Sequence, residues 1–214
     1  MISRTYSPLD QLVIRIDQVL APVFTTEESP TRQSPADSVE DQPLDRRERR
    51  LSTGLMRVNH SGEVAAQALY QAQAFTARSP SIRENMDQAA REENDHLAWC
   101  RQRVIELGGH TSVLNPVWYA GAFSIGTLAG LAGDRWSLGF LAETERQVVE
   151  HLQGHLQRLP GNDRKSRAIV KQMQEEEAHH GTRAMAIGGT ELPPVVKDAM
   201  RFCASIMTRT AYWL

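Results

Sequence analysis

The chain has 214 residues, enough for one ordinary domain with a substantial hydrophobic core or for two small domains. Its 24 Lys and Arg residues against 26 Asp and Glu residues give a formal net charge of -2, which argues against a nucleic-acid partner. The two cysteines, Cys100 and Cys203, lie far apart in apolar helical patterns. They are therefore predicted to be buried free thiols, and a disulfide or a Cys-x-x-Cys metal site is not expected.

The first 44 residues differ in composition from the rest of the chain. Apolar residues recur at helical spacing in residues 1–24, but Asp10 and Asp17 interrupt them, so we expect a short amphipathic helix and no signal peptide. Residues 25–44 are rich in Ser, Thr, Pro and acids and predict a disordered linker. Residues 45–214 are expected to form the folded domain. Its basic start, residues 45–50, is interpreted as a solvated first helical turn, with docking on anionic lipid headgroups as the alternative.

Helix-ending and helix-starting residues divide the folded part into six segments, and strand signals are almost absent. Ser79-Pro80 supplies an N-cap and a proline suited to the first helical turn, and the Gly108-Gly109 pair follows the end of that segment. The predicted helices run from Leu51 to Ala77, from Ser79-Pro80 to Gly108-Gly109, from Pro116 onward, from about Arg135 to Leu159, from the Pro160-Gly161-Asn162 turn to Gly188-Gly189, and from Pro193-Pro194 to the C-terminus.

The third segment is unusually apolar. No Asp, Glu, Lys or Arg occurs between Thr111 and Gly133, so its length alone would allow a membrane span. Its four glycines and the short stretch after Pro116 favour a buried or interfacial crossover helix instead. The last helix is amphipathic, and its apolar side is expected to face either the core or lipid.

Acidic side chains occupy positions where the helical pattern calls for apolar residues. Glu93 and His96 continue a row that includes Met86, Cys100 and Val104. The fifth segment repeats this pattern, with Glu177 and His180 in a row with Met173, Ala184 and Ile187. Two Glu-x-x-His pairs therefore face inward, where carboxylates without partners would be energetically costly.

A single glutamate precedes each of these pairs. Glu145 lies in the apolar row of the fourth segment, and Glu63 lies beside the apolar row of the first. The distance from Glu63 to Glu93 is 30 residues and the distance from Glu145 to Glu177 is 32 residues. Each half of the domain is thus a helical hairpin with a single glutamate on its first helix and a Glu-x-x-His pair on its second helix.

Two such hairpins packed together would bring four glutamates and two histidines into the interior. This is the di-iron or di-manganese carboxylate arrangement of ferritin-like proteins. Residues three apart on a helix point the same way, so each pair can hold one metal while the single glutamates bridge or cap the two metals. The predicted fold is an all-α, ferritin-like four-helix bundle with two hairpins, an apolar crossover helix and a C-terminal amphipathic helix.

The register of the second pair has an alternative, because Glu176 and His179 also match Glu-x-x-His. That face continues through Gln172 and Arg183 and is polar, so Glu177 and His180 are predicted to point inward. Glu176 and His179 are expected to face solvent or to support the ligands from outside. On the fourth segment, Glu145 is preferred because Glu143 and Glu150 lie outside the apolar row.

Four stretches carry a family resemblance. They are RVNHSGE at residues 57–63, EENDHL at 92–97, residues 142–151 (which begin with AETE and end with EH), and EEEAHH at 175–180. From about Leu51 to the C-terminus the sequence resembles the demethoxyubiquinone hydroxylase family, the membrane-associated di-iron monooxygenases of ubiquinone biosynthesis. The resemblance implies six iron ligands, which are also the six residues chosen from the helical pattern: Glu63, Glu93, His96, Glu145, Glu177 and His180.

The resemblance also implies an activity and its partners. The expected reaction uses O2 to hydroxylate the ring of a 2-polyprenyl-3-methyl-6-methoxy-1,4-benzoquinol at a centre of two Fe ions per chain. An external reductant is required, for which NADH, a reductase partner and the quinol itself are candidates. The expected location is the cytoplasmic face of the cell membrane, with peripheral membrane contact. Other ubiquinone-biosynthesis proteins and a second copy of the chain are the expected protein partners.

Other functions remain as alternatives to a hydroxylase. A ferritin-like ferroxidase would need an exit for iron and no lipid-facing surface, and a rubredoxin-linked peroxidase would need cysteine pairs that this sequence lacks. A radical protein of the ribonucleotide-reductase type would need a tyrosine near the metals, for which Tyr70 is a candidate. A non-enzymatic helical interaction bundle would use the inward acids only as structural groups.

Overall fold

The computed structural model describes residues 30–40 and 42–214, and the amphipathic helix predicted over residues 1–24 lies outside them. The described residues form six helices and no strand. Their bounds are α2 (Arg46–Thr76), α3 (Pro80–Glu106), α4 (Asn115–Leu131), α5 (Asp134–Arg158), α6 (Arg164–Ala186) and α7 (Pro194–Ala211).

The helix α2 begins five residues before its predicted start at Leu51. Asp45 caps it by accepting hydrogen bonds from the backbone N–H groups of Arg47 and Glu48, and the Glu48 side chain accepts one from the Asp45 N–H. This capping box satisfies N–H groups that lack a partner within the helix. The basic residues 46–50 are therefore the first turn of α2, and its arginines are solvent-exposed.

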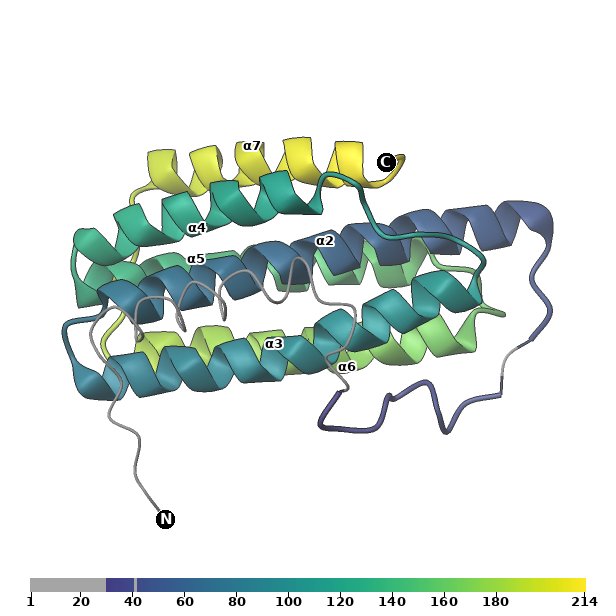
Figure 1. Cartoon of the computed structure of the whole chain (residues 1–214), viewed down its shortest axis with the longest axis horizontal. Coiled ribbons are helices and arrows are strands. Elements are labelled where there is room, and N and C mark those ends of the chain that lie inside the picture. The colour runs from purple at the N-terminus through teal and green to yellow at the C-terminus, as the bar shows by residue number, and fades with distance from the viewer. Residues whose placement is uncertain (1–29, 41) are drawn as a thin grey trace, which may run out of the picture.

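The bundle consists of two helical hairpins. α2 packs against α3 in the first hairpin, and α5 packs against α6 in the second. α4 crosses from the first hairpin to the second and packs mainly on α2, while α7 contacts α2 and α5 (Figure 1). Figure 1 shows α3 and α6 on one side of the molecule and α4 and α7 on the other. The predicted all-α arrangement of two hairpins, a crossover helix and a C-terminal helix is confirmed.

The crossover helix α4 lies close against α2. A Cβ atom at Gly126 would lie 2.9 Å from the Leu69 carbonyl oxygen, so this close approach requires glycine. The opposite face of α4 is open, and Val117, Leu128 and Leu131 are more than half exposed there. None of the described helices has both the length and the hydropathy needed to cross a membrane. The predicted crossover helix is confirmed by its contacts with α2 and α5, and its placement at a membrane interface stays a prediction.

The C-terminal helix α7 buries little of its apolar surface. Val195 and Phe202 are 74% and 66% exposed, and Ala211 is the one residue of α7 that is buried. The prediction that Cys203 is buried was wrong, because α7 turns this part of its apolar stripe away from the bundle. Cys100 is buried as predicted, and both thiols are free.

The chain before α2 differs from the predicted disordered linker over residues 30–40. Ala36 is buried in the core cluster that also contains Leu55 and Trp99. The Thr31 backbone N–H and hydroxyl donate hydrogen bonds to Asp95 on α3. The Ser, Pro and Asp content of this segment forms a turn that packs on the bundle, because these residues are turn formers as well as markers of disorder.

Candidate metal centre

The six predicted ligands come together in the middle of the bundle. α2 contributes Glu63, α5 contributes Glu145, and α3 and α6 contribute one Glu-x-x-His pair each. All six side chains are buried, although each is ionisable. Their inward direction follows from the helical period, because five of them continue rows of apolar residues that pack into the core and Glu63 lies beside such a row.

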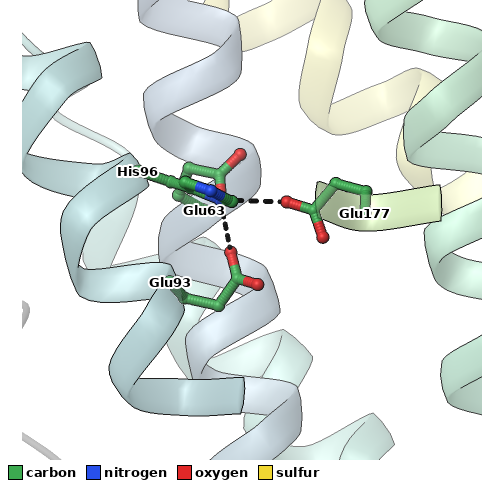
Figure 2. Close-up of side chains that lie close together, drawn as sticks. All are labelled: Glu63, Glu93, His96 and Glu177. Carbon is green, nitrogen blue, oxygen red and sulfur yellow. Dashed lines mark hydrogen bonds and ion pairs between the residues drawn. The ribbon is translucent and has the colours of Figure 1, made fainter. Parts of the chain in front are cut away.

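Two histidines share the same two carboxylates. His96 Nδ1 lies 3.3 Å from Glu93 Oε2 and 3.0 Å from Glu177 Oε1. His180 Nδ1 lies 3.3 Å from Glu93 Oε1 and 3.0 Å from Glu177 Oε2. Figure 2 shows the Glu93 and Glu177 carboxylates directed at the His96 ring. The glutamates of the two Glu-x-x-His pairs therefore stand between the histidines, where bridging ligands would be.

Each single glutamate is associated with one histidine. Glu63 Oε2 lies 3.6 Å from His96 Nδ1, and ligand atoms of Glu145, Glu177 and His180 lie within 4.8 Å of one another. The Tyr70 hydroxyl donates a 2.6 Å hydrogen bond to Glu145 Oε1. The sequence left open whether Glu63 and Glu145 bridge or cap. Their positions favour caps, because Glu63 lies beside His96 and Glu145 lies beside His180.

Burial and the neighbouring charges shift the pKa values of the centre in opposite directions. Burial raises the pKa of Glu63 and Glu145 well above the ordinary carboxyl value. For Glu93, burial opposes ionisation, but the charge of His96 and the close contact with His180 Nδ1 outweigh it and lower the pKa. Burial also opposes the protonation of His180, but hydrogen bonds to Glu177 and Glu93 raise its pKa to about 12. Without a compensating cation, burial therefore disfavours the ionised forms of Glu63 and Glu145.

The far side of each histidine contacts another carboxylate. His96 Nε2 lies 2.6 Å from Glu176 Oε2, and His180 Nε2 lies 2.7 Å from Glu92 Oε2. Each acid comes directly before the motif glutamate of the opposite pair, so α3 and α6 support each other's histidine. If such an acid accepts a hydrogen bond from Nε2–H of a neutral ring, the Nδ1 lone pair faces the centre. For Glu176 the sequence left open a solvent-facing position or a supporting role, and the structure shows the contact with His96. The sequence analysis missed Glu92, although the doubled acids at 92–93 and 176–177 mark both.

Three buried carboxylate oxygens in the centre have no aligned hydrogen-bond donor among the described residues. They are Glu63 Oε2, Glu93 Oε1 and Glu177 Oε1. Buried charged oxygens without such donors are costly unless a cation compensates them. Glu63, Glu93, His96 and Glu177 can each direct one ligand atom within 4.8 Å of the others, and Glu145, Glu177 and His180 form a second such group. Carboxylate and imidazole ligands suit divalent transition metals, so the residues fit two metal ions.

The other competing residues, Glu143, Glu150 and His179, lie outside the ligand cluster. Glu143 is buried, but both of its oxygens accept hydrogen bonds from Arg146. Glu150 and His179 are exposed. The preference for Glu145, Glu177 and His180 therefore agrees with the side-chain directions in the structure.

Comparisons with known proteins identify the family of this chain. A family model described as ubiquinone biosynthesis protein COQ7 matches residues 50–211. A Nitrosococcus oceani protein named 3-demethoxyubiquinol 3-hydroxylase is 56% identical over 214 residues, which are 100% of both chains. Proteins of that name from Nitrosospira multiformis and Acinetobacter baumannii are 55% and 52% identical. They cover 96% and 99% of this chain and 99% and 100% of their own lengths.

A solved structure supports the fold independently. The dodecameric thioferritin of Bacteroides fragilis matches with a TM-score of 0.53 and 18% identity, covering 72% of this chain and 89% of that chain. The ferritin-like class predicted from the repeated glutamate spacing is confirmed by this likeness. Because the family model and the full-length relatives cover the bundle and all six candidate ligands, the chain belongs to the family of the ubiquinone biosynthesis protein COQ7.

Proposed function

We propose that this chain is a 3-demethoxyubiquinol 3-hydroxylase, acting on the ring of a 2-polyprenyl-3-methyl-6-methoxy-1,4-benzoquinol. The observation that carries this proposal is the buried set of four glutamates and two histidines in a chain of the COQ7 family. The shared name of relatives that are 52–56% identical along nearly the whole chain supports the substrate. The overall change replaces a ring C–H bond by C–OH, and a reductant supplies two electrons while the second oxygen atom leaves as water.

Iron is the metal we propose for the six ligands. When bound, two iron ions supply the dioxygen chemistry that no side chain can perform. Glu63, Glu93, His96 and Glu177 would hold one metal, and Glu145, Glu177 and His180 would hold the other. The electron donor stays a prediction from the sequence, with NADH as a candidate.

The surrounding residues hold this ligand set and exclude water. Tyr70, Met86, Leu141 and Ala184 form one buried cluster around α2, α3, α5 and α6. The Tyr70 hydroxyl fixes one Glu145 oxygen, which leaves the other oxygen free to bind a metal. A dry, apolar enclosure strengthens the electrostatic interactions of the centre and limits side reactions.

The alternatives are less well supported. A ferroxidase or peroxidase would share the ligand set, but the relatives carry a hydroxylase name and the chain exposes apolar helices suited to a lipid-soluble substrate. A non-enzymatic bundle would give no reason to bury carboxylate oxygens without hydrogen-bond donors.

The cellular test is mass spectrometry of quinones extracted from cells that lack this protein. We expect a quinone lacking one methoxy group to accumulate, because hydroxylation must precede methylation at that ring carbon. Expression of the wild-type chain should restore the normal quinone. An unchanged quinone pool would favour ferroxidase or peroxidase chemistry.

We further propose that the face formed by α4 and α7 binds the membrane peripherally. Figure 1 shows both helices on the side of the bundle opposite α3 and α6, and their exposed side chains include Leu128, Phe202 and Ile206. Near the C-terminal end of α7, Arg46, Arg49 and Arg50 line a cavity of about 690 Å³ together with Trp213. Apolar side chains beside exposed arginines suit a bilayer with anionic headgroups. The cytoplasmic face stays the predicted location.

Vesicle sedimentation tests this surface with the variants Phe202→Ser and Ile105→Ser. Burying one large apolar side chain contributes about 1.5–3 kcal/mol, so Phe202→Ser should weaken binding to phosphatidylglycerol-containing vesicles at least roughly tenfold. Ile105 is 57% exposed but lies on α3, so Ile105→Ser should bind like the wild type. Equal binding by both variants would contradict the assignment of α7 to the bilayer.

A further inference from the structure

The segment before the bundle reaches the metal centre through one arginine. Residues 30–40 pack against α3 and α6, and Arg32 lies between Asp95 of α3 and Glu176 of α6. The family model begins at residue 50, so this arginine is outside the part of the chain that the model matches. Nothing in its local sequence, Pro-Thr-Arg-Gln-Ser, indicates a role at the centre.

The Arg32 guanidinium is held from several directions. Its Nε donates a 2.6 Å hydrogen bond to Asp95 Oδ2, and its two terminal nitrogens donate to the two Glu176 oxygens at 2.6 and 3.0 Å. It also lies 5.0 Å from the centre of the Trp99 ring. A planar guanidinium bound at both ends and stacked on an aromatic ring has little freedom, so it fixes the orientation of the carboxylate it contacts.

Glu176 transmits this orientation to a predicted metal ligand. Its Oε2 atom, 3.0 Å from an Arg32 nitrogen, also lies 2.6 Å from His96 Nε2. The result is a continuous chain of contacts from Arg32 through Glu176 to His96, whose Nδ1 faces the carboxylate cluster. Outer partners of this kind set the ring orientation of metal-binding histidines.

The other half of the centre lacks such an arginine. Glu92, which contacts His180, receives a hydrogen bond from Gln88 and has no arginine or lysine partner among the described residues. Its side chain is 36% exposed, against 18% for Glu176. Two halves that match in their ligands therefore differ in how firmly their histidines are supported.

We infer that Arg32 is a positioning residue which, through Glu176, fixes His96 and makes the centre hold its two metal ions with unequal strength. The metal on the His96 side leaves more slowly than the metal on the His180 side. This inference rests on the proposed di-iron function and adds to it an ordered loss of the two ions and a role for residues 30–40.

The test is the release of ferrous iron to a chelator, followed by absorbance with the full-length chain loaded anaerobically. We expect two phases of equal amplitude for the wild type. Mutation of a residue that supports a metal-binding histidine from outside typically lowers the metal affinity 10–100-fold. Arg32→Gln should therefore speed the slow phase roughly tenfold and leave the fast phase unchanged. Glu92→Gln should speed the fast phase alone, which assigns each phase to its half.

Arg146→Gln is the matched control. Arg146 is 43% exposed, against 42% for Arg32, and it also bridges two carboxylates, but neither Glu143 nor Glu150 contacts the six ligands. Its release kinetics should equal those of the wild type. Arg32→Lys keeps the charge without the planar fork and should resemble Arg32→Gln, with thermal unfolding showing that both variants are folded.

The release experiment distinguishes a failure of the inferred role of Arg32 from a failure of the proposed function. A wild-type chain that binds two irons but releases them in one phase overturns the inferred asymmetry and leaves the proposed function intact. Unchanged slow release in Arg32→Gln, with two irons bound, overturns the role of Arg32. A wild-type chain that binds no iron contradicts the proposed function itself.

Discussion

The Glu177→Ala variant is expected to lose bound iron and to hydroxylate demethoxyubiquinol at least about 100-fold more slowly than the wild type. Glu177 contacts both histidines, and it belongs to both groups of residues that could hold a metal. Removing it therefore affects both metal positions. Iron content of the purified protein, measured by elemental analysis, and product formation, measured by mass spectrometry, test the two parts of this expectation.

Glu175→Ala is the control for this experiment. Glu175 lies two residues earlier on α6, but its side chain is 57% exposed and its contact is a 3.9 Å ion pair with Lys171. Iron content and activity of this variant should match the wild type. A Glu177→Ala protein that retains two irons and full activity would support the non-enzymatic interpretation of the inward acids.

The Arg103→Met variant is expected to lower the free energy of unfolding by about 3–5 kcal/mol without removing any metal ligand. Arg103 is fully buried on α3 and donates a 2.7 Å hydrogen bond to Asp163, which is also fully buried and caps α6. Methionine fills similar space but leaves the Asp163 charge in the interior without its counter-ion. Urea denaturation followed by circular dichroism measures the difference.

Arg201→Gln is the control for stability. Arg201 forms an ion pair with Asp198 in which the side chains are 55% and 71% exposed, and exposed ion pairs contribute about 0–1 kcal/mol. The Arg103→Met loss should therefore be several times larger. A loss below about 1 kcal/mol for Arg103→Met would mean that the buried pair contributes no more than a surface pair.

The sequence alone determined the helices and indicated the candidate ligands. Proline and glycine pairs mark most helix ends, and the bounds of α3, α5 and α6 lie within a few residues of the predicted ones. Glu93, His96, Glu177 and His180 stand out because a charged residue in an apolar row is costly without a purpose. The 30- and 32-residue spacings then relate the two halves. These are local and periodic signals, which a single helix carries within its own sequence.

The tertiary structure decided how the groups share contacts. Only the packing of α3 against α6 places Glu92 on His180 and Glu176 on His96, because no sequence distance specifies which helices are neighbours. The same packing puts Glu93 and Glu177 between the histidines, with Glu63 beside His96 and Glu145 beside His180. Arg32 is the clearest example. Its segment has the composition of a disordered linker, and its order depends on Asp95 and Glu176, carboxylates 63 and 144 residues away in the chain.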